Sequence, residues 1–468
     1  MNFLLIIFQR LVMCITYKIT PGDYVFIRDL IVCSDEAYLN ELYNEITRNS
    51  DFLCSFTLYE SIKNNKKIKL LELNNKNIET GYNIFPKVFC EIADLRHLTI
   101  IGLNLCKLPN RFENLKDLKI LNLSNNKFQE FPKVLFSLTT LKTLSININK
   151  ITMIPSKIIE MTGLETLNIN HSYNLKNIYV DLCKLENLKE LDLSFNILLF
   201  ANENFIDCSM YSDSHLNTNS GYCDENSSMD KHGETFSCLK NLLIHNNSLS
   251  LFPSYFQNFV NLEELDISEN DFEKIPDEIY SFSKLKKLEI NHNRIKIINI
   301  GNNIFNNMLK LCIRNNEILQ CSISDNALQS LVSLDLSVNR IYKLDNNILK
   351  LKQLKYLIIF NNVLTEIEKY HHTRSGPSYL NLELKNISVL ANIFYYNNIE
   401  KLIIRCSERF DGSIDIFENA SANSKIKYLN LSNCYLANIP NTIFKLTNLT
   451  VFIANNNRIV ELKNVFGT

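Results

Sequence analysis

The stretch Leu118-Lys-Ile-Leu121-Asn-Leu123-Ser-Asn-Asn126-Lys-Phe128 decides the fold, because its spacing of apolar residues recurs along the chain. The clearest copies begin 23 residues apart, as from Leu118 to Leu141. Sixteen copies begin at Ile68, Leu95, Leu118, Leu141, Leu164, Leu188, Leu239, Leu262, Leu285, Met308, Leu331, Leu354, Tyr379, Ile399, Ile426 and Leu449. Self-similarity at a fixed period indicates a solenoid, in which each unit hides its apolar side only against its neighbours.

Each unit opens with a short strand in which apolar and polar residues alternate. Leu121 and Leu123 would point into a core, and Asn122 between them would point outward. The ninth position of the unit is asparagine in ten copies. A buried amide there can donate to and accept from backbone groups of neighbouring turns, so we expect a structural ladder of asparagines. Its members are Asn126, Asn149, Asn196, Asn247, Asn270, Asn293, Asn316, Asn339, Asn362 and Asn457.

The second half of the unit reads LPxxIxxLxxL, as in the stretch from Ile439-Pro440 to Leu446. Proline suits the first turn of a short helix or an extended segment, and the apolar residues after it would pack against the strands. The whole pattern is that of a leucine-rich repeat. It resembles the 23-residue LPxxIxxL class of Scribble-like and Ras-binding intracellular scaffold proteins.

This resemblance implies an α/β solenoid. The expected form is a curved leucine-rich-repeat horseshoe, with a parallel β-sheet on the concave face and short helices or extended segments on the convex face. The resemblance also implies that the protein binds other proteins and catalyses nothing. Six units depart from the asparagine ladder, which puts regular curvature in doubt at both ends; they carry Lys76, Leu103, Ser172, Ile387, Ser407 and Cys434.

Three segments do not follow the repeat. Residues 1–16 form a hydrophobic leader that is too short to span a bilayer, and it is either a cleaved signal peptide or a buried cap strand. Residues 17–66 carry apolar residues at helical spacing after Ser34-Asp35, which predicts a helical N-terminal cap. The solenoid would occupy residues 67–468, with a flexible insertion near 207–235. Cysteines and histidines in the insertion leave metal binding as an alternative, although their spacing fits no zinc pattern.

Charge and motif content exclude several classes of function. Lys and Arg (49) balance Asp and Glu (50), so nucleic acid is not an expected partner. The sequence has no GxGxxG or GxxxxGK[ST] phosphate loop and no HExxH or GxSxG motif, and its 13 cysteines form no CxxC pair. We therefore predict that the chain is not an enzyme, with no catalytic residues, no cofactor, no metal and no transmembrane helix.

Partner recognition would use the outward residues of the strands, because the core fixes the inward ones. Most outward residues are polar, but the strand begun by Leu354 carries apolar ones. Large apolar anchors with charges around them are typical of protein-binding hot spots. The predicted partner-binding residues are Arg314, Tyr356, Ile358, Phe360, Lys385, Ile403 and Arg405. The alternative is that the loop near 370–379 covers this patch.

A second outward surface is acidic. It contains Asp192, Asp266, Glu289 and Asp335. Two interpretations stay open for it: attraction of a basic partner, or simple solubility of a wide sheet.

Two functions remain open from the sequence. The resemblance favours a cytoplasmic scaffold or adaptor, and the alternative is a secreted or surface-exposed recognition or adhesion protein. Extracellular arrays usually carry clustered cysteines at their ends, and none is seen here, whereas cleavage of the leader would reverse the preference. In both cases the partner is a protein, and neither its identity nor an oligomeric state follows from the pattern.

Overall fold

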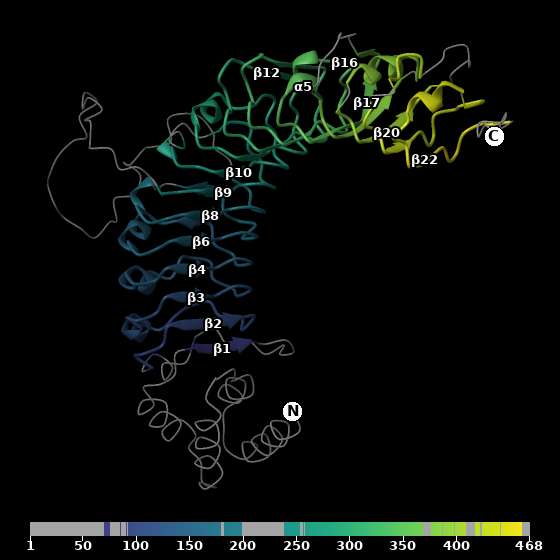
Figure 1. Ribbon diagram of the computed structural model, residues 1–468. Coiled ribbons are helices and arrows are strands. Elements are labelled where there is room, and N and C mark those ends of the chain that lie inside the picture. Colours follow the sequence, from purple (N-terminus) through teal and green to yellow (C-terminus); the bar gives the residue numbers. More distant parts are fainter. Residues whose placement is uncertain are drawn as a thin grey trace, which may run out of the picture. The chain divides into compact units, whose positions relative to one another are not determined.

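A computed structural model gives the fold of the chain (Figure 1). It describes residues 70–74, 92–178, 182–198, 238–252, 258–367, 376–385, 387–396, 398–408, 417–421, 424–439 and 441–460, and the single positions Phe85, Cys90 and Phe256. The predicted leader, helical cap and insertion lie outside the described residues. The chain divides into two units, Met1–Leu239 and Lys240–Thr468.

In the first unit each described repeat contributes one strand to a parallel sheet. In spatial order the strands are β1 (Leu70–Asn74), β2 (His97–Ile101), β3 (Ile120–Asn122), β4 (Thr143–Ser145), β6 (Thr166–Asn168) and β8 (Glu190–Asp192). Neighbouring strands pair one repeat apart, so that Leu121 lies beside Leu144 and Leu144 beside Leu167. A shift of one residue would turn these buried leucines out to water, which fixes the register.

The second unit is built in the same way. Its parallel strands are, in spatial order, β9 (Asn241–Leu243), β10 (Glu264–Asp266), β11 (Lys287–Glu289), β13 (Lys310–Cys312), β15 (Ser333–Asp335), β17 (Tyr356–Leu364), β19 (Tyr379–Leu384), β20 (Lys401–Cys406), β21 (Tyr428–Asn430) and β22 (Val451–Ile453). The leucines that alternate along these strands are buried, as Leu334 and Leu336 show. The predicted solenoid of parallel strands is therefore confirmed.

The second half of the repeat takes two forms. In some repeats it is a 3-10 helix: η2 (Asn110–Asn114), η3 (Lys133–Ser137), η4 (Ser156–Glu160), η5 (Leu182–Lys184), η8 (Asp277–Ser281), η9 (Ile387–Tyr395) and η10 (Asn441–Lys445). Elsewhere short strands pair with each other: β5 (Met153–Ile154) with β7 (Asn177–Ile178), β12 (Ile297–Ile300) with β14 (Gln320–Ile323), and β16 (Lys343–Leu344) with β18 (Glu366–Ile367).

Local sequence explains where these helices begin. Pro109, Pro132 and Pro276 lie in extended or similar conformation immediately before η2, η3 and η8, where the missing N–H of proline costs nothing. The α-helix α5 (Asn346–Lys350) instead begins after Asp345, whose carboxylate accepts the backbone N–H of Asn347 at 2.8 Å.

The ladder asparagines bond the backbone of two successive turns. Asn126 Oδ1 accepts the N–H groups of Leu103 and Leu105, each at 3.1 Å, and its Nδ2 donates to the carbonyls of Ile100 at 2.8 Å and Leu123 at 2.9 Å. The pattern returns down both units, for example at Asn149, Asn270, Asn316 and Asn362. Each amide thus satisfies buried backbone groups that have no strand partner.

A left-handed residue precedes each of the ten ladder asparagines. Asn125, Ile148 and Val338 have φ values of 55°, 53° and 57°. This conformation turns the chain sharply out of the strand, and it is unusual for the β-branched Ile148 and Val338. The ladder bonds that follow hold the turn closed.

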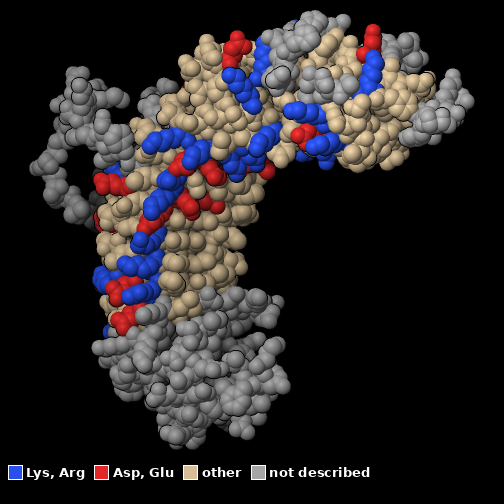
Figure 2. Space-filling model, in the orientation of Figure 1, with Lys and Arg blue, Asp and Glu red and all other residues tan. Residues whose placement is uncertain are grey.

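Basic and acidic side chains lie next to one another on the surface of each unit (Figure 2). In the first unit Glu165 pairs with Lys142 and, at 2.6 Å, with Lys189. In the second unit Glu263 pairs with Lys240 at 2.9 Å and with Lys286 at 2.6 Å. Hydrogen bonds from the two lysines lower the pKa of each glutamate to about 2.

We expect these pairs to stabilise the protein only above the acid range. A lowered pKa in the folded state contributes stability above the unfolded value of about 4.3, and this is lost as the pH falls towards 2. The combined variant Glu165→Gln, Glu263→Gln should therefore unfold at lower urea concentration than wild type at pH 6, and most of this difference should be lost at pH 2. Because the pairs are exposed, the difference should be small and should shrink in about 1 M salt, which screens exposed charges. A difference as large at pH 2 as at pH 6 would contradict the assignment.

Candidate interaction face

Outward side chains form rows across the strands, because neighbouring strands keep register. Each strand offers up to three outward positions, which we number rows 1, 2 and 3 in chain order; on β17 they are Tyr356, Ile358 and Phe360. From β9 to β22, row 2 contains Leu243, Asp266, Glu289, Cys312, Asp335, Ile358, Asn381, Ile403, Asn430 and Ile453. The row is acidic on β10, β11 and β15, and aliphatic on β9, β17, β20 and β22.

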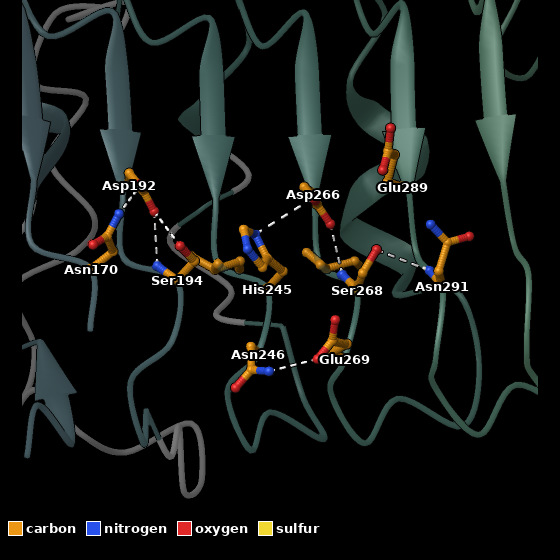
Figure 3. A network of polar contacts seen from close by, with 12 residues as sticks. Asn170, Asp192, Ser194, His245, Asn246, Asp266, Ser268, Glu269, Glu289 and Asn291 are labelled. Carbon is orange, nitrogen blue, oxygen red and sulfur yellow. Dashed lines mark hydrogen bonds and ion pairs between the residues drawn. The ribbon is translucent and has the colours of Figure 1, made fainter. Parts of the chain in front are cut away.

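The aspartates of row 2 serve the backbone. Asp335 Oδ1 accepts the N–H of Ser337 at 2.9 Å and its hydroxyl at 2.6 Å. In the first unit Asp192 Oδ1 holds Ser194 in the same way, at 3.0 and 2.6 Å (Figure 3). This is the Asx-turn arrangement, which satisfies an N–H where the strand ends. The acidic residues thus have a structural role that requires no basic partner.

The surroundings of Asp266 are similar (Figure 3). Asp266 Oδ1 accepts the N–H of Ser268 at 2.9 Å, and its Oδ2 lies 3.5 Å from Nδ1 of His245. The Ser268 hydroxyl in turn accepts the N–H of Asn291 at 3.1 Å. A serine whose oxygen is bonded to the backbone in this way acts as part of the strand-end turn.

Glu289 is neutralised by lysines of its own and the next strand. Its Oε1 lies 3.1 Å from Nζ of Lys287 and 3.0 Å from Nζ of Lys310. Burial raises the pKa of Glu289, but hydrogen bonds from Lys310 and Lys287 outweigh this effect and lower it overall. This carboxylate is therefore satisfied within the sheet.

Strands β17, β19, β20 and β21 present a different surface. Row 1 carries Tyr356, Tyr379, Lys401 and Tyr428; row 2 carries Ile358, Asn381, Ile403 and Asn430; row 3 carries Phe360, Glu383, Arg405 and Ser432. We call these residues, with Arg314, the aromatic face. Tyr356 is 49% exposed. Ile358, Phe360 and Ile403 are partly exposed, unlike the leucines beneath them.

Cations lie on the rings of this face. The guanidinium carbons of Arg314 and Arg405 lie 5.6 and 5.9 Å from the ring centroid of Phe360. The strand order places β13, which precedes Arg314, and β20 on opposite sides of β17, so the two arginines approach Phe360 from both sides. Such cation–π contacts hold both partners in place.

A second set of ring contacts lies in row 1. Lys401 Nζ lies 5.4 Å from the ring centroid of Tyr379 and 4.7 Å from that of Tyr428. The rings of Tyr356 and Tyr379 are 5.9 Å apart. The aromatic face is thus a connected set of rings and cations.

The structure brings together six of the seven predicted partner-binding residues and places the seventh, Lys385, apart from them. Lys385 lies beyond the end of β19, where its Nζ is 3.4 Å from Oε1 of Glu408. The row 3 residue of β19 is Glu383, which lies opposite Arg405. The predicted register was two residues off in this repeat, because Tyr379 pairs with Tyr356, the third residue of its unit, and not with Leu354.

Sequence reasoning missed Tyr379, Lys401 and Tyr428. The repeat pattern assigns Tyr379 to the first position of its unit, and the predicted surface includes row 1 only on the strand of Tyr356. Reading the third position of every unit would have found all three once the register was set. The proposed cover near 370–379 falls largely outside the described residues, which resume at Gly376.

Two kinds of feature are absent from the described residues. No helix there is long and apolar enough to cross a membrane. No group of three or more His, Cys, Asp or Glu side chains in that part of the chain could hold a metal ion.

Comparison with known families agrees with the repeat architecture. A model described as a leucine-rich repeat region matches residues 50–257, and two leucine-rich-repeat models match residues 237–295 and 425–446. No curated protein matches the sequence.

Solved structures with a similar fold are distant in sequence. A leucine-rich-repeat protein of Leptospira interrogans is 21% identical with a TM-score of 0.53, over 86% of this chain and 93% of that one. A TDR receptor is 19% identical with a TM-score of 0.52, over 86% and 66%. An internalin of Listeria monocytogenes is 18% identical with a TM-score of 0.48, over 87% and 86%. At these identities the likeness concerns the fold alone.

Proposed function

Because the chain belongs to the leucine-rich-repeat family, we propose that it is a non-catalytic scaffold or adaptor that binds protein partners on its aromatic face. Leucine-rich-repeat folds generally bind proteins, and stacked repeats provide a wide surface for this. The narrower likeness to Scribble-like and Ras-binding scaffolds, and the cytoplasmic location that it implies, are part of the proposal.

One observation carries the choice of surface. The aromatic face gathers partly exposed aliphatic and aromatic side chains with cations stacked on them, whereas the acidic part of row 2 is satisfied internally. Aromatic residues and arginine are the side chains most enriched among binding hot spots.

We expect the double variant Ile358→Asp, Phe360→Asp to lose its protein partners. Each aspartate would place a charge where the partner must exclude water, which should weaken binding about a hundredfold or more. The tagged chain and the variant would be used to capture proteins from the native cell, with quantitative mass spectrometry of what each retains.

The matched control is Leu243→Asp, which makes the same kind of change in row 2 of β9, away from the aromatic face. It should retain the wild-type set of partners. Circular dichroism and urea denaturation would show that all variants fold. If the double variant retains the same proteins as wild type, the aromatic face is not the binding surface.

A secreted or surface-exposed recognition protein is the second candidate, and it rests on the hydrophobic run of residues 1–16. Sequencing the N-terminus of the mature protein distinguishes the two. A mature chain that begins at Tyr17 would favour the secreted candidate.

A further inference from the structure

The cations of the aromatic face are among the basic residues of the second unit that have no acidic partner in the described part of the chain. Elsewhere a basic side chain commonly has an acidic partner, as Arg294 has Asp271 at 2.7 Å. Among the described residues, no carboxylate oxygen lies within 4.0 Å of the charged nitrogens of Arg314, Lys401 or Arg405. Their positive charge is therefore not neutralised by an ion pair in that part of the chain.

Ring contacts hold these cations without removing their charge. Arg314 and Arg405 lie against Phe360, and a guanidinium stacked on a ring keeps its N–H donors at its edge. A side chain already held in position loses less conformational entropy when it pairs with a ligand. The arrangement is suited to receive carboxylates.

The single carboxylate of the aromatic face does not offset this excess. Glu383 lies opposite Arg405, but its Oε2 accepts the backbone N–H of Asn361 at 3.1 Å. The same face carries three cations, Arg314, Lys401 and Arg405. The face is thus positive although the whole chain has a net charge of -1.

Asn381 adds a polar group at the centre of the face. Its Oδ1 is buried and has no hydrogen-bond partner among the described residues. At the same row position on β21, Asn430 Oδ1 accepts the N–H of Ser432 at 2.9 Å. The strand β19 continues to Leu384, so the chain does not turn after Asn381 as it does after Asn430. A buried amide oxygen without a partner is costly, and a backbone N–H of a bound chain would satisfy it once the side chain rotates towards the surface.

We propose that the aromatic face binds an acidic peptide segment of a partner protein, in extended form, with a large apolar side chain on Ile358 and Phe360. The inference deepens the proposed function and rests on it. Carboxylates on either side of the apolar residue pair with Arg314 and Arg405, and the peptide backbone bonds Asn381.

The geometry sets the spacing of the peptide residues. The arginines lie on opposite sides of Phe360, at 5.6 and 5.9 Å from its centroid. Two residues of extended chain span about 6.6 Å. The favoured segment therefore has aspartate or glutamate two positions before and two positions after an aromatic or large aliphatic residue.

The test uses the full chain and a displayed library of random peptides of about twelve residues, a length that covers an extended binding segment. Selected peptides should be enriched in sequences that carry an acidic residue two positions before and two positions after a large apolar residue. Synthetic copies would then be measured by fluorescence anisotropy. The variant Arg314→Glu, Arg405→Glu should bind them at least about tenfold more weakly, because truncated or reversed charge pairs cost this much or more.

The matched control is Lys284→Glu, Lys352→Glu, which changes the net charge equally in the loops that precede β11 and β17. Its affinity for the selected peptides should equal that of wild type. A single-stranded oligothymidine serves as a polyanion without apolar anchors or carboxylates, and it should bind weakly.

Each other outcome overturns the inference. Selected peptides that depend on Phe360 but show no acidic enrichment would leave the proposed function standing and remove the acidic partner. Peptides that do not depend on Phe360, or an empty selection, would also remove it, while the capture experiment decides the proposed function separately. Equal binding of oligothymidine, lost in the arginine variant, would indicate a general polyanion surface.

Discussion

Replacing Asn339 by alanine will lower the free energy of unfolding of the second unit by about 3 kcal/mol. The Asn339 amide donates to the carbonyls of Ile313 at 2.9 Å and Leu336 at 3.0 Å, and its Oδ1 accepts the N–H of Ile318 at 3.1 Å. Alanine leaves these buried groups without partners, and each unsatisfied group costs roughly 1–3 kcal/mol. The damage should affect adjacent repeats, because each repeat is stable only against its neighbours.

Urea denaturation followed by circular dichroism would measure the loss. The control is Asn299→Ala, because Asn299 is an exposed asparagine on β12. This variant should unfold within about 0.5 kcal/mol of wild type, as surface substitutions usually do. Equal stability of the two variants would mean that the ladder amides are not needed to satisfy the turns.

Replacing Phe272 by alanine should destabilise the second unit by about 3–5 kcal/mol. Its side chain is 1% exposed and is among the largest fully buried side chains of the described residues. Removing the ring loses apolar burial and leaves a cavity that the stacked turns on either side cannot fill by collapsing. The same denaturation experiment gives the value.

The matched control for the ring is Phe444→Ala. Phe444 lies on η10 and is 52% exposed, so its removal should change stability by less than about 1 kcal/mol. A similar loss in both variants would show that Phe272 stabilises the protein by something other than burial in the core.

The sequence predicted the repeat and the inward leucines because both follow from local spacing. The wrong register predicted at Tyr379 shows that local spacing alone does not determine how a strand pairs with its neighbour. In the stretch Tyr379 to Leu384 the residues Leu380, Leu382 and Leu384 alternate with polar or aromatic ones, and all three leucines are buried. A slip of two residues keeps the same leucines inward, so the pattern cannot choose between the two registers. Pairing with β17 decides the register, and that pairing is not local in sequence.

The candidate site was predictable in part. Alternation identified Ile358, Phe360 and Ile403 as outward, because a strand fixes which face a residue takes. It could not reveal that Arg314 reaches Phe360, since this contact spans two strand spacings and depends on side-chain length. Alternation also could not show that the Asn381 side chain has no strand-end N–H to accept among the described residues, whereas Asn430 accepts the N–H of Ser432 at the turn after its strand.

The common register of the strands has a consequence for how such a protein can change. Each strand pairs with the equivalent positions of the next repeat's strand. The backbone edges that successive repeats present to each other are therefore nearly the same. Duplication, deletion or exchange of one whole repeat would therefore leave the strand pairing between the remaining repeats intact. New recognition surfaces could then arise by exchange of whole repeats as well as by point mutation within one repeat.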